Sequence, residues 1–252
     1  MSKKLRLILI LTAAFLAAAC LFLFLLWKGI LRLNHPSAQV YPVRGVDVSS
    51  YQGEIDWDSL AAQNISFAFI KATEGSSLVD PYFAYNYEQA KKTPLRIGAY
   101  HFFSYDSSGL TQAENFIAQV EKYDNMLPPV VDIEFYGDKA ENPPSKEAVD
   151  QELQSLLDRL EAHYGMKPIL YATYHSYNLY LKNSYLDYDI WIRNVYTYPY
   201  FLDERDWTFW QYTDKEQWNG YSGPEKCIDV NVFNGTEEEF AGYGKESNAD
   251  CF

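Results

Sequence analysis

The sequence predicts an α/β fold, a TIM-like incomplete barrel preceded by one N-terminal transmembrane helix. Strand-like and helix-like patterns alternate along the chain, with about eight strands in all, and this alternation favours a closed barrel with a parallel sheet. Helical patterns become sparse after residue 182, so we expect the last strands to be joined by loops or hairpins. A separate apolar run at the N-terminus predicts the transmembrane helix.

The N-terminal segment has the composition of a membrane anchor. Three basic residues within residues 1–6 precede an uninterrupted apolar run over residues 7–27, which is long enough to cross a bilayer as a helix. The positive-inside rule places residues 1–6 in the cytoplasm and the rest of the chain outside, so the protein would be a single-pass protein of the cell membrane. Secretion after signal cleavage is the alternative, but a signal peptide has a shorter apolar region. The run therefore predicts an uncleaved signal anchor.

The remaining residues divide into a linker, one globular domain and a tail. Residues 28–42 are polar and interrupted by proline, and fully extended they would reach roughly 50 Å at about 3.3 Å per residue. Residues 43–242 are the predicted barrel domain, and residues 243–252 are the tail. A chain of 252 residues is enough for one large domain with a sizeable core.

Short apolar runs mark the strands of the barrel, and amphipathic runs mark its helices. The first helix has an acidic cap, the second has Pro81 in its first turn, and the longest begins behind Ser145. The predicted strands are residues 45–49, 66–72, 96–103, 128–135, 168–172, 189–194, 208–212 and 227–232. The predicted helices are residues 56–63, 81–92, 111–123 and 145–164.

The strand at residues 128–135 ends in two carboxylates, Asp132 and Glu134. Because strand side chains alternate between faces, both acids point to the same side. A chance pair at a strand edge or a structural cation site would have the same spacing, but the surrounding residues are apolar, and acids are rarely buried without a partner or a function. Two carboxyl groups commonly cleave glycosidic bonds, one as a protonated acid and one as a nucleophile or charge stabiliser. We therefore hypothesise a glycoside hydrolase.

Two further aspartates lie on the first and last predicted strands. Asp47 alternates with valines along residues 45–49, and Asp229 has the equivalent place in residues 227–232. The first and last strands become neighbours when a barrel closes, so four carboxylates would surround one pocket. Such crowding raises the pKa of at least one of them and keeps it protonated, as an acid catalyst requires. Pairing with buried donors or loop capping is the alternative for both aspartates.

Aromatic residues supply candidate walls for a sugar-binding cleft. The chain contains 22 Tyr, 15 Phe and 6 Trp, and sugar sites often use such rings as flat apolar platforms. For any single ring, packing in the core is the alternative. The substrate-binding candidates at or near predicted strand ends are Tyr100, His101, Tyr171, Trp191 and Trp210.

Charge and motifs argue against several other functions. Residues 1–35 hold five of the 21 basic residues and none of the 34 acidic ones, which argues against nucleic acid as a partner of the exported part. The histidines lack metal-ligand spacing and no Gly-x-Ser-x-Gly elbow is present, so we expect no metal, no cofactor and no serine hydrolase chemistry. Cys227 and Cys251 lie on the exported side and would either form one disulfide or remain two thiols.

Six motifs in register resemble glycoside hydrolase family 25, the bacterial and phage muramidases. The resemblance covers residues 43–234. The motifs are GVDVSSYQGEIDW (residues 45–57), FIKATEG (69–75), GAYHF (98–102), VDIE (131–134), WQY (210–212) and DVNVF (229–233).

The resemblance implies a (β/α)5(β)3 barrel that cleaves the β-1,4 bond between N-acetylmuramic acid and N-acetylglucosamine in peptidoglycan. It assigns Glu134 as the general acid, Asp132 as the second acid, and Asp47 and Asp229 as two further active-site aspartates. It favours retention of configuration, with either Asp132 or the substrate's own acetamido group as the nucleophile. No wall-binding repeat is recognisable, so targeting to peptidoglycan strands would depend on the membrane anchor, and we expect a monomer.

Two other functions remain open at this point. One is a catalytically silent glycan-binding protein, although all four carboxylates are present. The other is a hydrolase of the same fold that acts on a different N-acetylhexosamine linkage.

Overall fold

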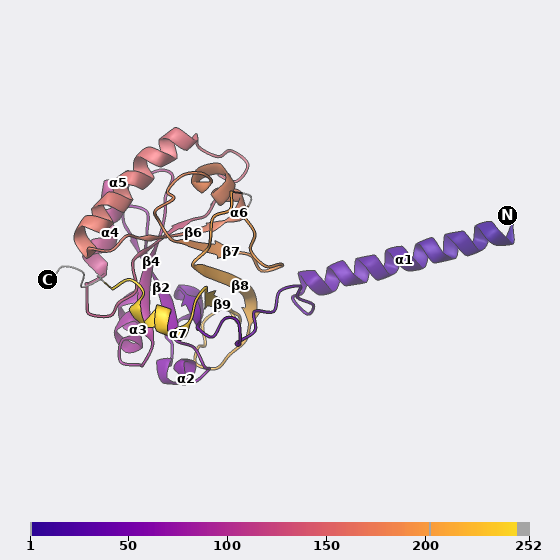
Figure 1. The fold of residues 1–252 in the computed structure, drawn as a ribbon, viewed down its shortest axis with the longest axis horizontal. Coiled ribbons are helices and arrows are strands. Elements are labelled where there is room, and N and C mark those ends of the chain that lie inside the picture. Colours follow the sequence, from indigo (N-terminus) through magenta and orange to yellow (C-terminus); the bar gives the residue numbers. More distant parts are fainter. Residues whose placement is uncertain (1, 202, 246–252) are drawn as a thin grey trace.

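The computed structural model describes residues 2–201 and 203–245 of the chain, and Figure 1 shows its arrangement. Eight strands close into a barrel because β1 pairs with both β2 and β9, which confirms the predicted mixed α/β barrel. Neighbouring strands from β1 to β8 run parallel, whereas β9 runs antiparallel to β8 and β1. In barrel order the strands are β1 (Arg44–Val48), β2 (Phe67–Glu74), β4 (Arg96–Phe102), β5 (Val130–Ile133), β6 (Ile169–Thr173), β7 (Ile190–Arg193), β8 (Phe209–Glu216) and β9 (Ile228–Phe233).

The helices that cover the barrel lie close to their predicted positions. Two of them begin at a side-chain cap: Asp56 accepts from the backbone N–H of Ser59 at 3.1 Å, and Ser145 accepts from the backbone N–H of Ala148 at 3.3 Å. The covering helices are α2 (Trp57–Ala61), α3 (Phe83–Ala90), α4 (Gly109–Gln119) and α5 (Lys146–Tyr164).

Several short elements were not predicted. The two-residue strand β3 (Leu78–Val79) pairs with the end of β2 outside the barrel, and a 3-10 turn, η1 (Ser50–Gln52), follows β1. The helical turns α6 (Tyr174–Ser176) and η2 (Tyr177–Leu181) lie between β6 and β7, and α7 (Glu237–Gly242) follows β9. These segments are too short to show a helical or strand period in the sequence.

The barrel has two separate cores. The larger one lies between the outer face of the strands and the helices. The smaller one fills the barrel interior with rings that include Phe67, Phe69 and Phe209. Phe240 of α7 packs on Phe67 and covers the end of the barrel where the parallel strands begin. Space for these rings exists because Gly45 has no side chain: a Cβ there would lie 2.4 Å from the ring of Phe67. The interior core leaves only the C-terminal half of the barrel for polar side chains.

Helix α1 (Lys3–Trp27) projects from the barrel (Figure 1). It begins at Lys3, four residues before the predicted apolar run, because the side chain of Ser2 accepts a hydrogen bond from the Leu5 N–H at 3.2 Å. By length and composition it can cross a membrane, and a signal sequence would have the same properties.

The segment after α1, which the sequence predicts to be a linker, lies against the barrel. It runs down the outside of the barrel along β8, and its contacts hold it there. The amide of Asn34 donates to the carbonyl oxygens of Tyr212 and Asn194, at 2.8 and 3.2 Å. Near the beginning of β8, the ring of Tyr41 lies 5.6 Å from that of Trp207. The sequence missed this docking because its polar contacts go to main-chain groups far away in the chain.

The two alternatives for Cys227 and Cys251, one disulfide or two thiols, involve Cys251, which lies outside the described part of the chain. Cys227 directly precedes β9 and is partly exposed.

Candidate active site

A pocket of about 200 Å³ lies at the C-terminal rim of the barrel, the edge where the parallel strands β1 to β8 end. The aromatic layer of the inner core forms its floor. Side chains alternate between the two faces of a strand, so a residue faces the pocket when it lies an even number of positions from an inward-pointing ring on the same strand. The lining residues are Asp47, Ser49, Tyr51, Lys71, Tyr100, Phe102, Asp132, Glu134, Tyr171, Trp191, Gln211 and Asp229.

Asp132 on β5 and Glu134, which follows the last residue of β5, both line this pocket. Burial raises the pKa of both carboxyls, and the charge of Glu134 raises the pKa of Asp132 further. Because the two groups interact strongly, a bound proton belongs to the pair rather than to one residue. Oδ1 of Asp132 is buried and has no hydrogen-bond partner among the described residues. The pair therefore holds a proton more readily than an isolated carboxyl would, and it offers one free acceptor among the described residues.

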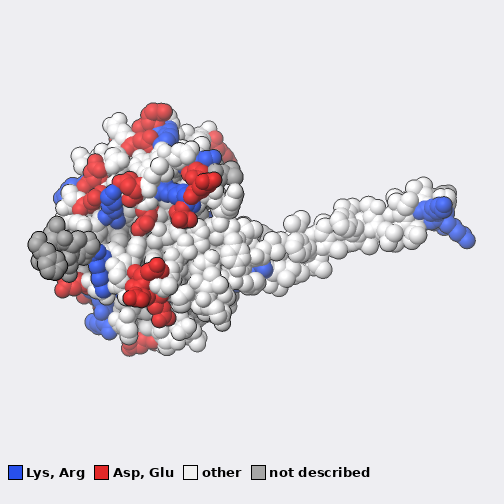
Figure 2. All heavy atoms as spheres, viewed as in Figure 1, with Lys and Arg blue, Asp and Glu red and all other residues white. Residues whose placement is uncertain are grey.

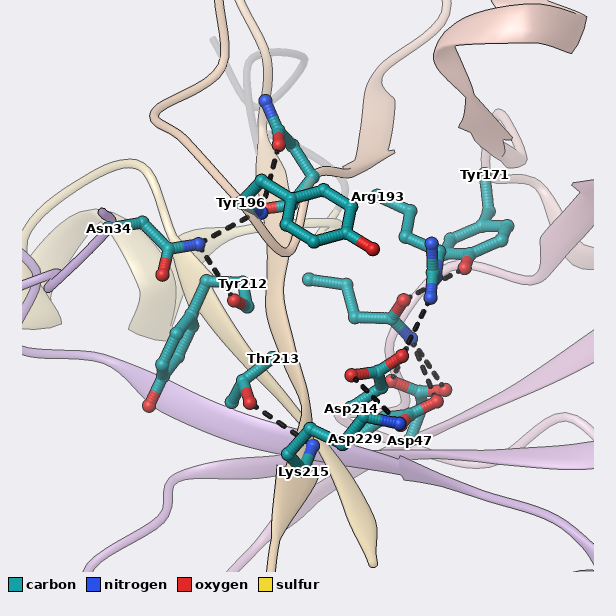
Figure 3. Close-up of polar contacts among 12 residues, drawn as sticks. Asn34, Asp47, Tyr171, Arg193, Tyr196, Tyr212, Thr213, Asp214, Lys215 and Asp229 are labelled. Carbon is teal, nitrogen blue, oxygen red and sulfur yellow. Dashed lines mark hydrogen bonds and ion pairs between the residues drawn. The ribbon is translucent and has the colours of Figure 1, made fainter. Parts of the chain in front are cut away.

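Asp47 and Asp229 face each other across the antiparallel pair β1 and β9 (Figure 3). The side-chain amide of Gln211 connects them, donating to Oδ1 of Asp47 at 3.0 Å and to Oδ2 of Asp229 at 3.1 Å. Asn231 donates to Asp47 at 2.7 Å. Burial and the charge of Asp47 raise the pKa of Asp229 to about 9, and burial raises the pKa of Asp47.

Two basic side chains face the carboxylates. Lys71 donates to Glu74 at 2.7 Å, and Arg193 donates to Oδ2 of Asp214 at 2.8 Å. Their positive charges oppose the rise in the pKa of Glu134, although burial outweighs them. Neither residue was predicted from the sequence as a site residue. Lys71 lies in the FIKATEG motif, and its place two residues after the inward-facing Phe69 is the signal that would have found it.

Three of the five predicted aromatic candidates line the pocket: Tyr100, Tyr171 and Trp191. Tyr171 donates to Oε1 of Gln211 at 3.0 Å, and Trp191 donates to Oδ1 of Asn231 at 2.8 Å. These rings therefore fix the amides that hold the aspartates, in addition to forming the wall.

Two rings at the mouth of the pocket were not predicted. Tyr51 is 64% exposed, and Phe102 also lines the opening. Exposed rings in such positions can stack on a sugar with less loss of packing than the buried ones.

The structure places the other two candidates, His101 and Trp210, outside the pocket. Each follows or precedes a pocket residue on its strand, so it points to the outer core, and both side chains are 0% exposed. His101 is hydrogen-bonded to Thr73 at 2.8 Å and to Gln112 at 3.0 Å. Burial lowers the pKa of His101 to about 4, which keeps it neutral. Trp210 packs against Trp207 and donates to the carbonyl of Asn194 at 2.8 Å.

The geometry can be compared with known proteins. The family model described as glycosyl hydrolases family 25 matches residues 46–221, which include Asp47, Asp132 and Glu134. The chain belongs to glycosyl hydrolase family 25. As a family 25 protein it is a glycoside hydrolase, as its sequence motifs predicted.

Solved structures and a curated relative from the same family agree with this assignment. A family 25 glycosyl hydrolase from Bacillus anthracis has 56% sequence identity and a TM-score of 0.80, over 85% of this chain and 98% of that one. A bacterial lysozyme from Streptomyces coelicolor has 30% identity and a TM-score of 0.70, over 80% of this chain and 96% of that one. Lysozyme M1 of Streptomyces globisporus is 32% identical over 212 residues, covering 77% of this chain and 68% of the relative.

Proposed function

We propose that this family 25 hydrolase cleaves the β-1,4 bond between N-acetylmuramic acid and N-acetylglucosamine in peptidoglycan. The relatives named as lysozymes support this substrate class. The observation that carries the proposal is the set of four carboxylates in one pocket: Asp132 and Glu134 at the end of β5, and Asp47 and Asp229 on the paired strands β1 and β9.

Glu134 is the general acid in this proposal. Burial raises its pKa, so the carboxyl retains a proton to give to the glycosidic oxygen as the bond to the anomeric carbon breaks. The same residue, now ionised, then removes a proton from the water that attacks the anomeric carbon. The configuration is retained because two displacements occur at that carbon.

Asp132 assists the first displacement. Its buried Oδ1 has no hydrogen-bond partner within residues 2–201 and 203–245, and an N–H of the substrate's acetamido group would supply one. A hydrogen bond to the charged form favours ionisation of Asp132, so the proton of the pair would move to Glu134 when substrate binds. The acetamido carbonyl oxygen then attacks the anomeric carbon, and the negative charge of Asp132 stabilises the oxazolinium ion that forms.

Asp47 and Asp229 tune and position the site. Gln211 and Asn231 fix the carboxylate of Asp47 with hydrogen bonds of 2.7 to 3.2 Å. The charge of Asp47 raises the pKa of Glu134, which helps it to remain protonated. Asp229 has a pKa of about 9 and is therefore able to donate a hydrogen bond to a substrate hydroxyl near neutral pH.

The test is mass spectrometry of borohydride-reduced products after the protein has acted on purified peptidoglycan. Reduced muramic acid at the new ends supports the proposal, and Glu134→Gln should lower the rate about 100-fold or more with binding largely kept. Glu88→Gln is the matched control, because Glu88 forms a surface ion pair with Lys91 on α3, and its rate should stay unchanged. Near-full activity of the Glu134→Gln protein would contradict the assignment.

The same experiment separates the alternatives. Reduced glucosamine at the new ends would move the cut to the other peptidoglycan linkage. Binding without any new ends would favour the catalytically silent glycan-binding protein.

We also infer that α1 is an uncleaved anchor, with its N-terminus in the cytoplasm and the barrel outside. Its 25 residues correspond to about 37 Å of helix, enough for the roughly 30 Å hydrocarbon core. The barrel fits the incomplete (β/α)5(β)3 type because helices follow β1, β2, β4, β5 and β6, whereas β7, β8 and β9 follow one another directly. The expectation of a monomer stays a prediction. N-terminal sequencing of the protein purified from membranes tests the anchor.

A further inference from the structure

The rim of the barrel that carries the catalytic pocket is also the rim from which α1 departs. A hollow at the end of α1 is lined by Trp27 on one side and by Tyr196, Asp214 and Lys215 on the other. Asp214 and Lys215 also line the space beside Asp47 and Asp229, next to the catalytic pocket. Figure 3 shows these side chains on the same end of β8, with Asp214 pointing toward Arg193. The anchor joint and the active site therefore share one strand end.

The joint between α1 and the barrel is a folded turn. The backbone N–H groups of Ile30 and Leu31 both donate to the carbonyl of Leu25, at 3.0 and 3.1 Å, so the chain turns back on the helix end. Directly afterwards, Arg32 pairs with Glu216 at the end of β8. Asn34 then forms its two buried hydrogen bonds to main-chain carbonyls. The helix end is thus continuous with a segment that is fixed on the rim.

This docking shortens the reach of the domain. Only residues 28–31 lie between the end of α1 and the ion pair of Arg32. Even if they were pulled straight, they would span only about 13 Å, compared with the roughly 50 Å of the whole segment 28–42. If α1 spans the bilayer, the C-terminal rim lies at the membrane surface.

The surface around the joint suits that position. Trp27 is 65% exposed and Tyr196, on the loop after β7, is 56% exposed. Ile30 and Leu33 are exposed as well. Figure 2 shows few charged side chains on the visible part of the barrel near the base of α1, whereas charges are frequent farther away. Tyr and Trp are enriched where proteins meet the headgroup region of a membrane.

We propose that this site acts on glycan strands that lie at the outer surface of the membrane and are still attached to a membrane lipid, in preference to strands in more distant wall layers. The inference rests on the proposed function and on α1 as an anchor. A lipid-attached strand and the anchored rim share the same thin layer, so their effective concentration is high. A strand farther away than the short joint allows would not reach the pocket.

The test uses the full chain in liposomes that also carry lipid-attached glycan strands, polymerised in place from a lipid-linked disaccharide-peptide precursor. Intact wall sacculi, added outside, are the second substrate. The key variant has about 20 Gly and Ser residues inserted after Gly29, which adds roughly 25 Å of mean reach and leaves the docked segment unchanged. The matched control has the same insertion after Asn64, in an exposed turn that precedes β2 on the opposite rim.

We expect the unmodified protein and the Asn64 insertion to cut lipid-attached strands at least about 10-fold faster than sacculi. The Gly29 insertion should raise cleavage of sacculi about 10-fold and thereby remove the preference. Equal rates on both substrates for all three proteins would overturn the inference while leaving the muramidase activity established. Absence of muramic acid ends from every substrate would instead overturn the proposed function.

Discussion

Replacing Asp229 by asparagine should make the folded protein more stable at neutral and alkaline pH, although the residue belongs to the pocket. In the folded chain the pKa of Asp229 is about 9, because the carboxyl is desolvated and lies beside Asp47, whereas its ordinary value is 3.8. Between these two pH values the folded state holds a proton that the unfolded state has lost. The contribution of Asp229 to the free energy of unfolding is therefore highest below about pH 4, and it falls as the pH rises toward 9.

The size of this effect follows from the same values. At pH 7, keeping the carboxyl protonated in the folded chain costs about 4 kcal/mol, at 1.36 kcal/mol per pH unit. Water in the pocket screens part of this, because the side chain of Asp229 is only partly buried, and we expect about 2 kcal/mol. Asparagine carries no charge, and its Oδ1 can still accept the hydrogen bond that Gln211 now donates at 3.1 Å. The substitution thus removes the cost and keeps the contact.

The assay is guanidinium denaturation of the chain in detergent, followed by tryptophan fluorescence at pH values from about 4 to about 9. The gain in stability of Asp229→Asn should be near zero at the acid end and grow with pH, while hydrolysis falls. Asp106→Asn is the control of opposite sign, because hydrogen bonds from Lys139 and Tyr136 lower the pKa of Asp106. That variant should lose stability by a similar amount across this pH range, because Asp106 is ionised throughout it, and the loss should shrink only below about pH 4. A gain for Asp229→Asn that stays constant across the pH range would refute the reasoning.

Two further predictions concern Tyr171, whose hydroxyl holds Gln211, and the interior core. Tyr171→Phe removes the 3.0 Å hydrogen bond to Gln211 and should lower kcat/KM about 5-fold. The control, Tyr180→Phe, loses a similar hydrogen bond to the carbonyl of Pro144 outside the pocket and should leave kcat/KM unchanged. Equal effects of the two substitutions in steady-state kinetics would contradict the role of Tyr171. Gly45→Ala should destabilise the fold by about 1 to 3 kcal/mol because the new methyl group meets Phe67, and thermal melts should show no such loss for Gly242→Ala, where nothing lies within 4 Å.

Strand alternation predicted much of the fold, and it predicted that four particular carboxylates lie in one pocket. The spacing of Asp132 and Glu134 implied a shared face, and the ends of the chain supplied Asp47 and Asp229 for adjoining strands. Those four side chains line one pocket, as expected from their positions, and their catalytic roles remain the proposal made above.

The same alternation, applied more strictly, would have corrected the aromatic candidates. Tyr100 and His101 are consecutive on β4, so only one of them can face the interior, and likewise Gln211 rather than Trp210 faces it on β8. Sequence patterns do not say which parity points inward on a strand whose two faces are both buried. On β4 the inward face is the one that carries Gly98, because a Cβ there would lie 2.5 Å from the ring of Phe69, which belongs to the interior core.

The docking of the segment after α1 was beyond sequence patterns for a different reason. Asn34 is one polar residue in a polar segment, and its partners are main-chain carbonyls more than 150 residues away. Main-chain groups are present at every residue, so no pattern of residue types marks them as partners.

The closure of the barrel by its first and last strands has a consequence for the timing of activity. Asp47 depends on Asn231, 184 residues later in the chain, for its 2.7 Å hydrogen bond, and it pairs with Asp229 only when β9 has joined β1. A chain that still lacks β9 therefore has no complete set of acids. The pocket becomes complete only after the last strand has been made and has joined the first.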